Sequence, residues 1–173
     1  MFLGYLKVFS HNTNGGLFPN KEAVSEYNPT NSNADLFSIL NLLDEFKDSN
    51  GNFHFKLCYP ELKGIGGKSC NEWIQSSNPL TANNITGFRA IDLAFDKNSY
   101  GQPWAGLGRN LPQYEGAALI DDAPLQSRWW SAIGAFSYYP SPRRIPGPRL
   151  PPDENENTVT IAELYVFHLG TGK

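Results

Sequence analysis

The chain has 173 residues, enough for one domain with a sizeable hydrophobic core, and its length does not require a second domain. Charged residues make up 18% and the net charge is −3, with no basic stripe, so binding to a phosphate backbone is not expected. No apolar run approaches the roughly 20 residues that span a bilayer. We therefore expect one domain over residues 1–173, with no nucleic-acid partner and no membrane span.

The first half of the chain predicts a strand, a helix and a second strand. Residues 4–10 alternate as a strand does, and residues 11–16 are typical of a turn. Apolar positions follow a helical repeat over residues 33–47, where Ser32 or Asn33 can cap the start, so this segment is predicted to be an amphipathic helix. Gly51 suits the sharp turn over residues 48–52 that ends it. A strand over residues 53–59 follows.

The second half predicts further strands at irregular spacing, over residues 71–75, 88–95, 117–120, 129–138 and 159–167. The long connections favour a β-rich (α+β) fold, a decorated antiparallel β-sandwich with one amphipathic helix. Residues 140–157 are rich in proline and are expected to follow the surface in an extended course. The last strand then needs a partner, which we expect to be near the first strand.

The only two cysteines, Cys58 and Cys70, are twelve positions apart with three glycines between them. A disulfide would close this short loop and would indicate an oxidising compartment, whereas two reduced, buried thiols are the alternative. The single acceptor sequon, Asn84-Ile85-Thr86, is compatible with a secreted surface loop. The opening residues lack the pattern of a signal peptide. The expectation is a secreted, disulfide-bonded protein: either an export signal has been removed and Met1 added for expression, or export uses another route.

Motifs for catalysis are missing from the sequence. The three histidines show no metal-ligand spacing, and neither a nucleophile elbow nor a phosphate-binding loop occurs. Asp121 and Asp122 are adjacent, so on a strand they point to opposite faces and make a poor acid and base pair. Glu61 or Glu72 would need a second acid brought close in space. We therefore expect no enzyme, with a glycan-acting hydrolase as the lowest alternative.

Carbohydrate recognition suits the residue inventory better, because aromatic rings stack on sugar rings while polar side chains bind their hydroxyls. The candidate ligand-binding residues are Trp104, Arg109, Asp121, Asp122, Arg128, Trp130 and Asn78. Each also has a structural interpretation: either tryptophan can belong to the core, and the aspartates can tighten a turn. Trp129 and Trp130 face opposite sides of a strand, so one of them is expected in the core, as is Trp73.

Calcium is the remaining cofactor to weigh. Asp48, Asn50 and Asn52 offer oxygen ligands at alternate positions, like the first half of an EF-hand loop. The glutamate required at the twelfth position is missing, and a turn explains the same residues equally well. No cofactor is therefore expected to be required, and calcium stays an alternative.

Several fragments in order resemble one known group of proteins. They are GGLF, NADLFSIL, FHFKLCYPEL, CNEWIQSSNP, WAGLG, LIDDAP, WWSAIGA and IPGP. Together, from Tyr5 to Phe167, they resemble an uncharacterised extracellular module of marine invertebrate proteins, some of which are associated with fibrinogen-related or lectin-like domains. The resemblance implies an extracellular location and a recognition role, and it identifies no site.

The function expected from these observations is that of a secreted, lectin-like module that binds glycans or glycoproteins without covalent chemistry. A homo-oligomer is expected because weak single-site sugar affinity is commonly strengthened by presenting several sites. The alternative is a structural or adhesive domain of the extracellular matrix that binds protein partners.

Overall fold

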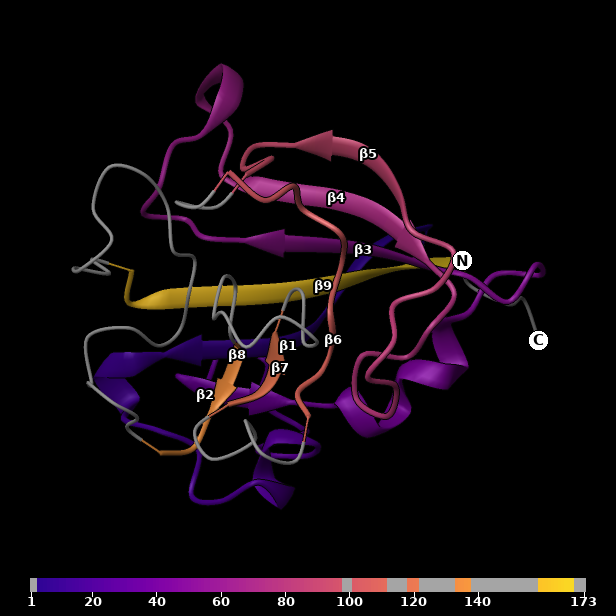
Figure 1. Ribbon diagram of the computed structural model, residues 1–173. Coiled ribbons are helices and arrows are strands. Elements are labelled where there is room, and N and C mark those ends of the chain that lie inside the picture. The colour runs from indigo at the N-terminus through magenta and orange to yellow at the C-terminus, as the bar shows by residue number, and fades with distance from the viewer. Residues whose placement is uncertain (1–2, 98–100, 112–117, 122–132, 138–158, 170–173) are drawn as a thin grey trace.

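The computed structural model describes residues 3–97, 101–111, 118–121, 133–137 and 159–169, and these are mostly antiparallel strands (Figure 1). The strands are β1 Leu3–Asn12, β2 Leu36–Ser38, β3 Phe53–Cys58, β4 Cys70–Gln75, β5 Arg89–Leu93, β6 Gly108–Arg109, β7 Ala118–Asp121, β8 Ile133–Ala135 and β9 Ile161–Leu169. Short 3₁₀ helices interrupt the connections: η1 Thr13–Gly15, η2 Glu22–Val24, η3 Leu40–Phe46 and η4 Ile65–Gly67.

A six-stranded sheet in the order β2-β1-β9-β3-β4-β5 forms the main layer. Its long central pair is β1 with β9, which runs antiparallel from Leu3 opposite Leu169 to Asn12 opposite Ile161. This confirms that the last strand pairs with the first. The second sheet, β6-β7-β8, has three short antiparallel strands and lies in front of the six-stranded sheet in Figure 1.

The core lies between the two sheets, and strands of the six-stranded sheet such as β3 turn alternate side chains toward it. On β3 the side chains of Phe53, Phe55 and Leu57 are fully buried, while the residues between them are half-buried. Leu119 of β7 and Ile133 of β8 belong to the same hydrophobic cluster. The predicted class, a β-rich antiparallel sandwich, is confirmed.

The amphipathic helix predicted over residues 33–47 is wrong in its extent and its type. Residues 36–38 form strand β2, which pairs with β1 on one side, while Ser38 bridges to Tyr27 on the other. Only Leu40–Phe46 is helical, and it is a 3₁₀ helix. Leu36, Phe37 and Ser38 are all buried. The consecutive apolar residues Leu36 and Phe37 fitted a helical repeat in the sequence, but hydrogen bonding to neighbouring strands gives the segment an extended conformation.

Two other predicted segments lie partly or wholly outside the described residues. Of the strand predicted over 129–138, the described residues contain β8, Ile133–Ala135. The proline-rich segment over 140–157 lies outside the described residues. Within the described part of the chain, no helix has the length and apolar character needed to cross a membrane.

The predicted disulfide between Cys58 and Cys70 is present. Cys58 ends β3, Cys70 begins β4, and the register places them directly opposite each other, with their Cα atoms 4.1 Å apart. The bond therefore closes the loop of residues 59–69 at the point where the two strands separate.

Candidate ligand-binding face

Among the described residues of the expected saccharide site, Trp104 and Asp121 are buried. Trp104 is 3% exposed, and its ring packs edge-on against Trp73 with centroids 5.0 Å apart. Asp121 is also 3% exposed, on β7 opposite Gly108. Both expectations are corrected, because a ring or carboxylate within the core offers no face to a ligand in solution. The core position predicted for Trp73 is confirmed, since its side chain is fully buried.

The other expected ligand residues support loops or lie outside the described residues. The Asn78 side chain accepts a hydrogen bond from the Leu80 N–H at 2.9 Å, which tightens a turn. Arg109 is half-buried and donates from Nη1 to the Leu80 carbonyl at 3.4 Å. Asp122, Arg128, Trp129 and Trp130 lie outside the described residues.

Asp48 is engaged by its own turn. Its Oδ1 accepts hydrogen bonds from the Asn50 and Asn52 N–H groups, at 2.8 and 2.9 Å, and its Oδ2 lies 3.2 Å from His54 Nε2. The Asn52 hydrogen bond, opposed by partial desolvation and helped by Asn50 and His54, lowers the pKa of Asp48. Within the described residues, no three His, Cys, Asp or Glu side chains gather as a metal site. The geometry around Asp48 is that of a turn closed by hydrogen bonds.

Charged and aromatic side chains gather on the face of the six-stranded sheet that points away from the core. The register places Lys7, Tyr165, Lys56 and Glu72 side by side across β1, β9, β3 and β4. We call this surface the outer face and define it by the residues of that row and its neighbours. They are Tyr5, Lys7, His54, Lys56, Glu72, Glu163, Tyr165 and Phe167.

Two clusters of the same composition occupy the outer face. In the first, Glu72 receives Lys56 Nζ on Oε1 at 2.9 Å and the Tyr5 hydroxyl on Oε2 at 3.3 Å. The Lys56 ammonium also lies 5.3 Å from the centroid of the Tyr5 ring. Each carboxylate oxygen of Glu72 therefore has its own donor, and the tyrosine ring is held in place from two directions.

The second cluster repeats this arrangement with residues of β1 and β9. Glu163 receives Lys7 Nζ on Oε1 at 2.6 Å and the Tyr165 hydroxyl on Oε2 at 2.8 Å. Lys7 Nζ lies 5.9 Å from the centroid of the Tyr165 ring. Both lysines are thus neutralised by a glutamate while they contact an aromatic ring.

Both tyrosines keep their protons at neutral pH. Partial burial, the charge of Glu72 and the hydrogen bond to it raise the pKa of Tyr5 to about 12. Partial burial and the hydrogen bond to Glu163 likewise raise the pKa of Tyr165. Each phenol therefore remains a hydrogen-bond donor and a neutral ring.

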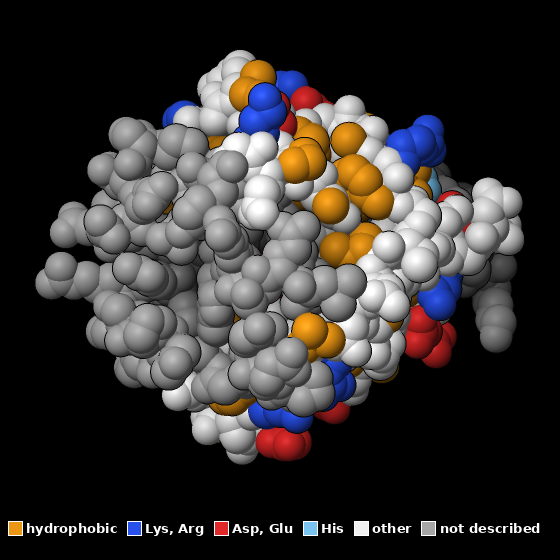
Figure 2. Space-filling model, in the orientation of Figure 1, with side chains coloured by type: hydrophobic (Ala, Val, Ile, Leu, Met, Phe, Trp, Pro, Cys, Tyr) orange, Lys and Arg blue, Asp and Glu red, His pale blue; other side chains and the backbone are white. Residues whose placement is uncertain are grey.

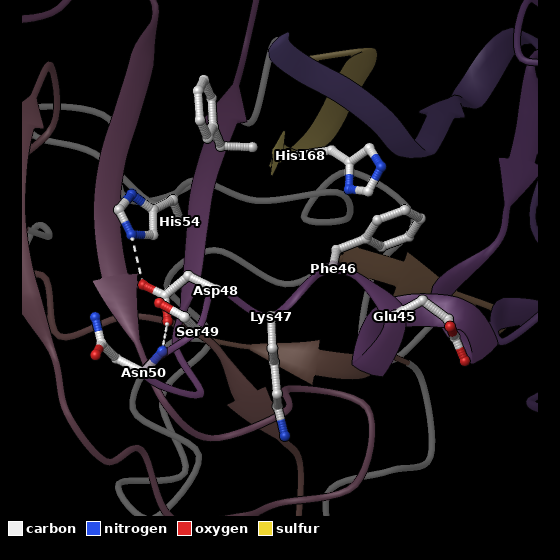
Figure 3. A pocket seen from close by; sticks show the side chains of 9 residues that line it. Glu45, Phe46, Lys47, Asp48, Ser49, Asn50, His54 and His168 are labelled. Atoms are coloured by element: carbon white, nitrogen blue, oxygen red, sulfur yellow. Dashed lines mark hydrogen bonds and ion pairs between the residues drawn. The ribbon is translucent and has the colours of Figure 1, made fainter. Parts of the chain in front are cut away.

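Two pockets are lined in part by residues of the outer face. The central pocket, about 250 Å³, is lined by Tyr5, Lys56, Cys58 and Tyr165. The end pocket, about 330 Å³, is lined by residues 45–50, His54, Phe167 and His168. In Figure 3, the His54 ring points toward Asp48, and His168 lies beside the Phe46 ring, from which its centroid is 5.3 Å away. The rings of Phe167 and Tyr5 connect the two pockets, because their centroids are 5.5 Å apart.

The outer face can bind by ring stacking and hydrogen bonding. Glu72 and Glu163 are each held in an ion pair with a lysine, so their carboxylate oxygens are fixed in position as hydrogen-bond acceptors.

The outer face was missed in the sequence, although period-two alternation carried part of the signal. In the sequence Tyr5 and Lys7 are two positions apart, and in β9 Glu163, Tyr165 and Phe167 alternate with the buried residues Ala162, Leu164 and Val166. Once the first and last strands are paired, this alternation places all five on one face. The sequence did not predict that β3 pairs with β9 and β4 with β3.

Comparisons with protein-family models, with curated proteins and with solved structures find no match to this chain. The resemblance to marine invertebrate extracellular modules therefore stays a prediction.

Proposed function

We propose that this chain is a carbohydrate-binding recognition module that binds glycans or glycoproteins through the outer face, without covalent chemistry. One observation carries the proposal: half-exposed aromatic rings lie beside fixed hydrogen-bonding groups on one face of the sheet. Tyr5, Tyr165 and Phe167 supply rings for stacking, and Glu72 and Glu163 supply acceptors whose positions are set by ion pairs. Sugars present both an apolar ring face and hydroxyl groups, so this surface is complementary to them.

An extracellular location is part of the proposal. The Cys58–Cys70 disulfide is compatible with an oxidising compartment. Asn84, which begins the only sequon, is exposed on the loop between β4 and β5. Assembly into a homo-oligomer would present several outer faces at once and raise the avidity for a repeated glycan.

A glycan array tests this function, run on the purified protein with calcium and again with EDTA. We expect selective binding that is the same in both conditions, because the outer-face groups bind without a metal. Replacing Tyr165 with leucine should lower the affinity for the array hit by about fivefold, the order expected from losing one aromatic contact. Ile65→Ala is the control, since Ile65 is 56% exposed in the loop of residues 59–69 and lines neither of the two pockets. A blank array in both conditions would contradict the proposal.

A protein-binding, adhesive role is the second candidate, and the edge strand β5 favours it. Within the described residues, β5 pairs only with β4, so one side of its backbone has no partner strand. Ile91 on this strand is 51% exposed, and Figure 2 shows hydrophobic side chains gathered on the side of the molecule where β4 and β5 lie. A strand from another protein can add to such an edge.

The two functions separate by mutation. If β5 holds a protein partner, Ile91→Lys should abolish adhesion to a matrix-coated surface while glycan binding is kept. Tyr165→Leu should do the reverse. Loss of adhesion only with Tyr165→Leu would remove β5 from consideration.

A further inference from the structure

The charges on the outer face cancel one another. Lys7 pairs with Glu163 and Lys56 pairs with Glu72, with N–O distances of 2.6 and 2.9 Å. Each lysine of the outer face therefore already forms an ion pair with a glutamate of the same face. A sulfated or uronic-acid glycan would have to compete for these ammonium groups, and it would meet the glutamates as like charges. This balance favours an uncharged ligand.

The aromatic contacts are distributed along a line. Tyr165 and Phe167 are two residues apart on β9 and share a face, so they are separated by about 7 Å along the strand. Tyr165 lines the central pocket and Phe167 lines the end pocket. One sugar ring cannot cover both aromatic rings at this separation, whereas two consecutive rings of a chain can.

The two pockets belong to one continuous strip. Phe167 contacts Tyr5 of the central pocket at 5.5 Å and lies 6.3 Å from His54 of the end pocket, measured between ring centroids. His54 and Lys56 are successive outer-face positions on β3 and line the end and central pockets respectively. The strip therefore follows β9 along its length.

We propose that the ligand is an uncharged, linear oligosaccharide that lies lengthwise along β9, with one sugar unit over Phe167 in the end pocket and the next over Tyr165 in the central pocket. This inference rests on the proposed glycan-binding function. It adds the class of glycan, a minimum length of two sugar units and the alignment of the glycan chain with β9. The ring of Tyr5 bridges the two positions, and its hydroxyl is held by Glu72.

The test is calorimetric titration of the full chain with oligosaccharides of one to six units. Neutral series of β-1,4-linked glucose, N-acetylglucosamine and mannose are compared with a galacturonate series of the same lengths. We expect the association constant of one neutral series to rise at least about tenfold between one and three units, as a second stacking contact is added, and then to level off. The galacturonate series should bind more weakly at every length.

Variants assign the two contacts. Phe167→Leu and Tyr165→Leu should each reduce the association constant of the trisaccharide about fivefold. Only one of the two variants should change the association constant of the monosaccharide, because a single sugar unit can occupy only one of the two positions. Ile65→Ala serves as the control and should leave the length series unchanged. If a variant unfolds, the length series of the unmodified protein decides on its own.

The outcomes separate this inference from the function on which it rests. A monosaccharide that binds as tightly as the hexamer, or tighter binding by the galacturonate series, would overturn the linear, uncharged ligand and would still support a carbohydrate-binding protein. No heat from any series, together with a blank glycan array, would overturn both.

Discussion

Gln75 illustrates how a single polar side chain supports the core of this fold. Its Oε1 accepts from Trp73 Nε1 at 2.7 Å and from the Leu107 N–H at 3.0 Å, and its Nε2 donates to the Leu107 carbonyl at 2.9 Å. The side chain is fully buried and ties β4 to the segment that precedes β6. Gln75 therefore satisfies core polar groups that have no access to water.

Replacing Gln75 with leucine should destabilise the protein by at least about 3 kcal/mol, because several buried polar groups lose their partner at once. Urea unfolding followed by tryptophan fluorescence measures the change. Asn41→Leu is the control: Asn41 is exposed and, within the described residues, its side chain bonds only Glu26, at 2.9 Å, so the cost there should stay within about 0.5 kcal/mol. Equal effects at the two positions would contradict this role for Gln75.

Gly64 is required for a steric reason. A Cβ atom at this position would overlap the carbonyl oxygen of Ala94, which accepts a hydrogen bond from the Ile65 N–H at 2.8 Å. Gly64→Ala should therefore cost about 3 kcal/mol, since backbone has to move. Gly101→Ala is the comparison, because Gly101 has a φ of +73° and open space around it, so only the conformational cost of about 1 kcal/mol applies. Thermal unfolding should place Gly64→Ala below Gly101→Ala, and the reverse order would refute the steric argument.

At the scale of elements, the disulfide and the sheet register support each other. Cys58 and Cys70 are the last aligned pair of β3 and β4, and beyond them the Tyr59 N–H donates to the Ser69 carbonyl at 2.9 Å. The loop beyond this pair contributes Glu61, whose carboxylate accepts hydrogen bonds from the Thr160 and Ile161 N–H groups at the start of β9. One short loop thus fixes three strands.

Removing the disulfide should cost about 3 kcal/mol in the chain-entropy description, because the closed loop spans twelve positions. The double variant Cys58→Ser with Cys70→Ser should show this loss in urea unfolding and should retain the β-sheet circular dichroism spectrum. Treatment of the unmodified protein with a reductant should lower its stability by a similar amount. A reductant effect on the double variant itself would show that the change has another cause.

The alternation of apolar and polar residues predicted the positions of strands better than it predicted which strands pair. The strands at 53–59, 71–75 and 159–167 were placed within a few residues, and the first and last of them show a period of two. The segment from Leu36 to Ser38 was assigned to a helix because the apolar positions over residues 33–47 fit a helical repeat, whereas the structure buries all three residues in a strand. Pairing with β1 and the bridge to Tyr27 decide its conformation, and neither is encoded within the segment.

For the whole molecule, acid stability depends on carboxylates that hold loops in place. Partial burial raises the pKa of Glu61, but hydrogen bonds from Thr160 and Ile161 outweigh it, so the pKa is lowered from 4.5. The pKa of Asp48 is lowered from 3.8, mainly by the Asn52 hydrogen bond. Since both folded-state values lie below the unfolded ones, the stability they contribute is complete above pH 4.5 and is lost as the pH falls through the folded-state values.

We therefore expect the urea midpoint to fall steadily below about pH 4. Glu61→Gln and Asp48→Asn should each be less stable than the unmodified protein at pH 6, and the difference should shrink as the pH falls and the native carboxyls become protonated. Glu45→Gln is the control, because Glu45 is exposed and forms none of the described hydrogen bonds. A constant difference between pH 6 and 2.5 would show that the variants act through packing rather than charge.

The sequence alone determined the β-rich class, the turn at Gly51, the disulfide and the core position of Trp73, because these follow from local alternation, backbone geometry and side-chain type. Only the tertiary structure decided which aromatic residues are exposed. Trp104 is buried against Trp73, whereas Tyr5 and Tyr165 remain half-exposed. The contacts of the outer face join residues 67 and 156 positions apart, as in Tyr5 with Glu72 and Lys7 with Glu163. Such pairs depend on strand order and register, which the packing of the whole chain selects.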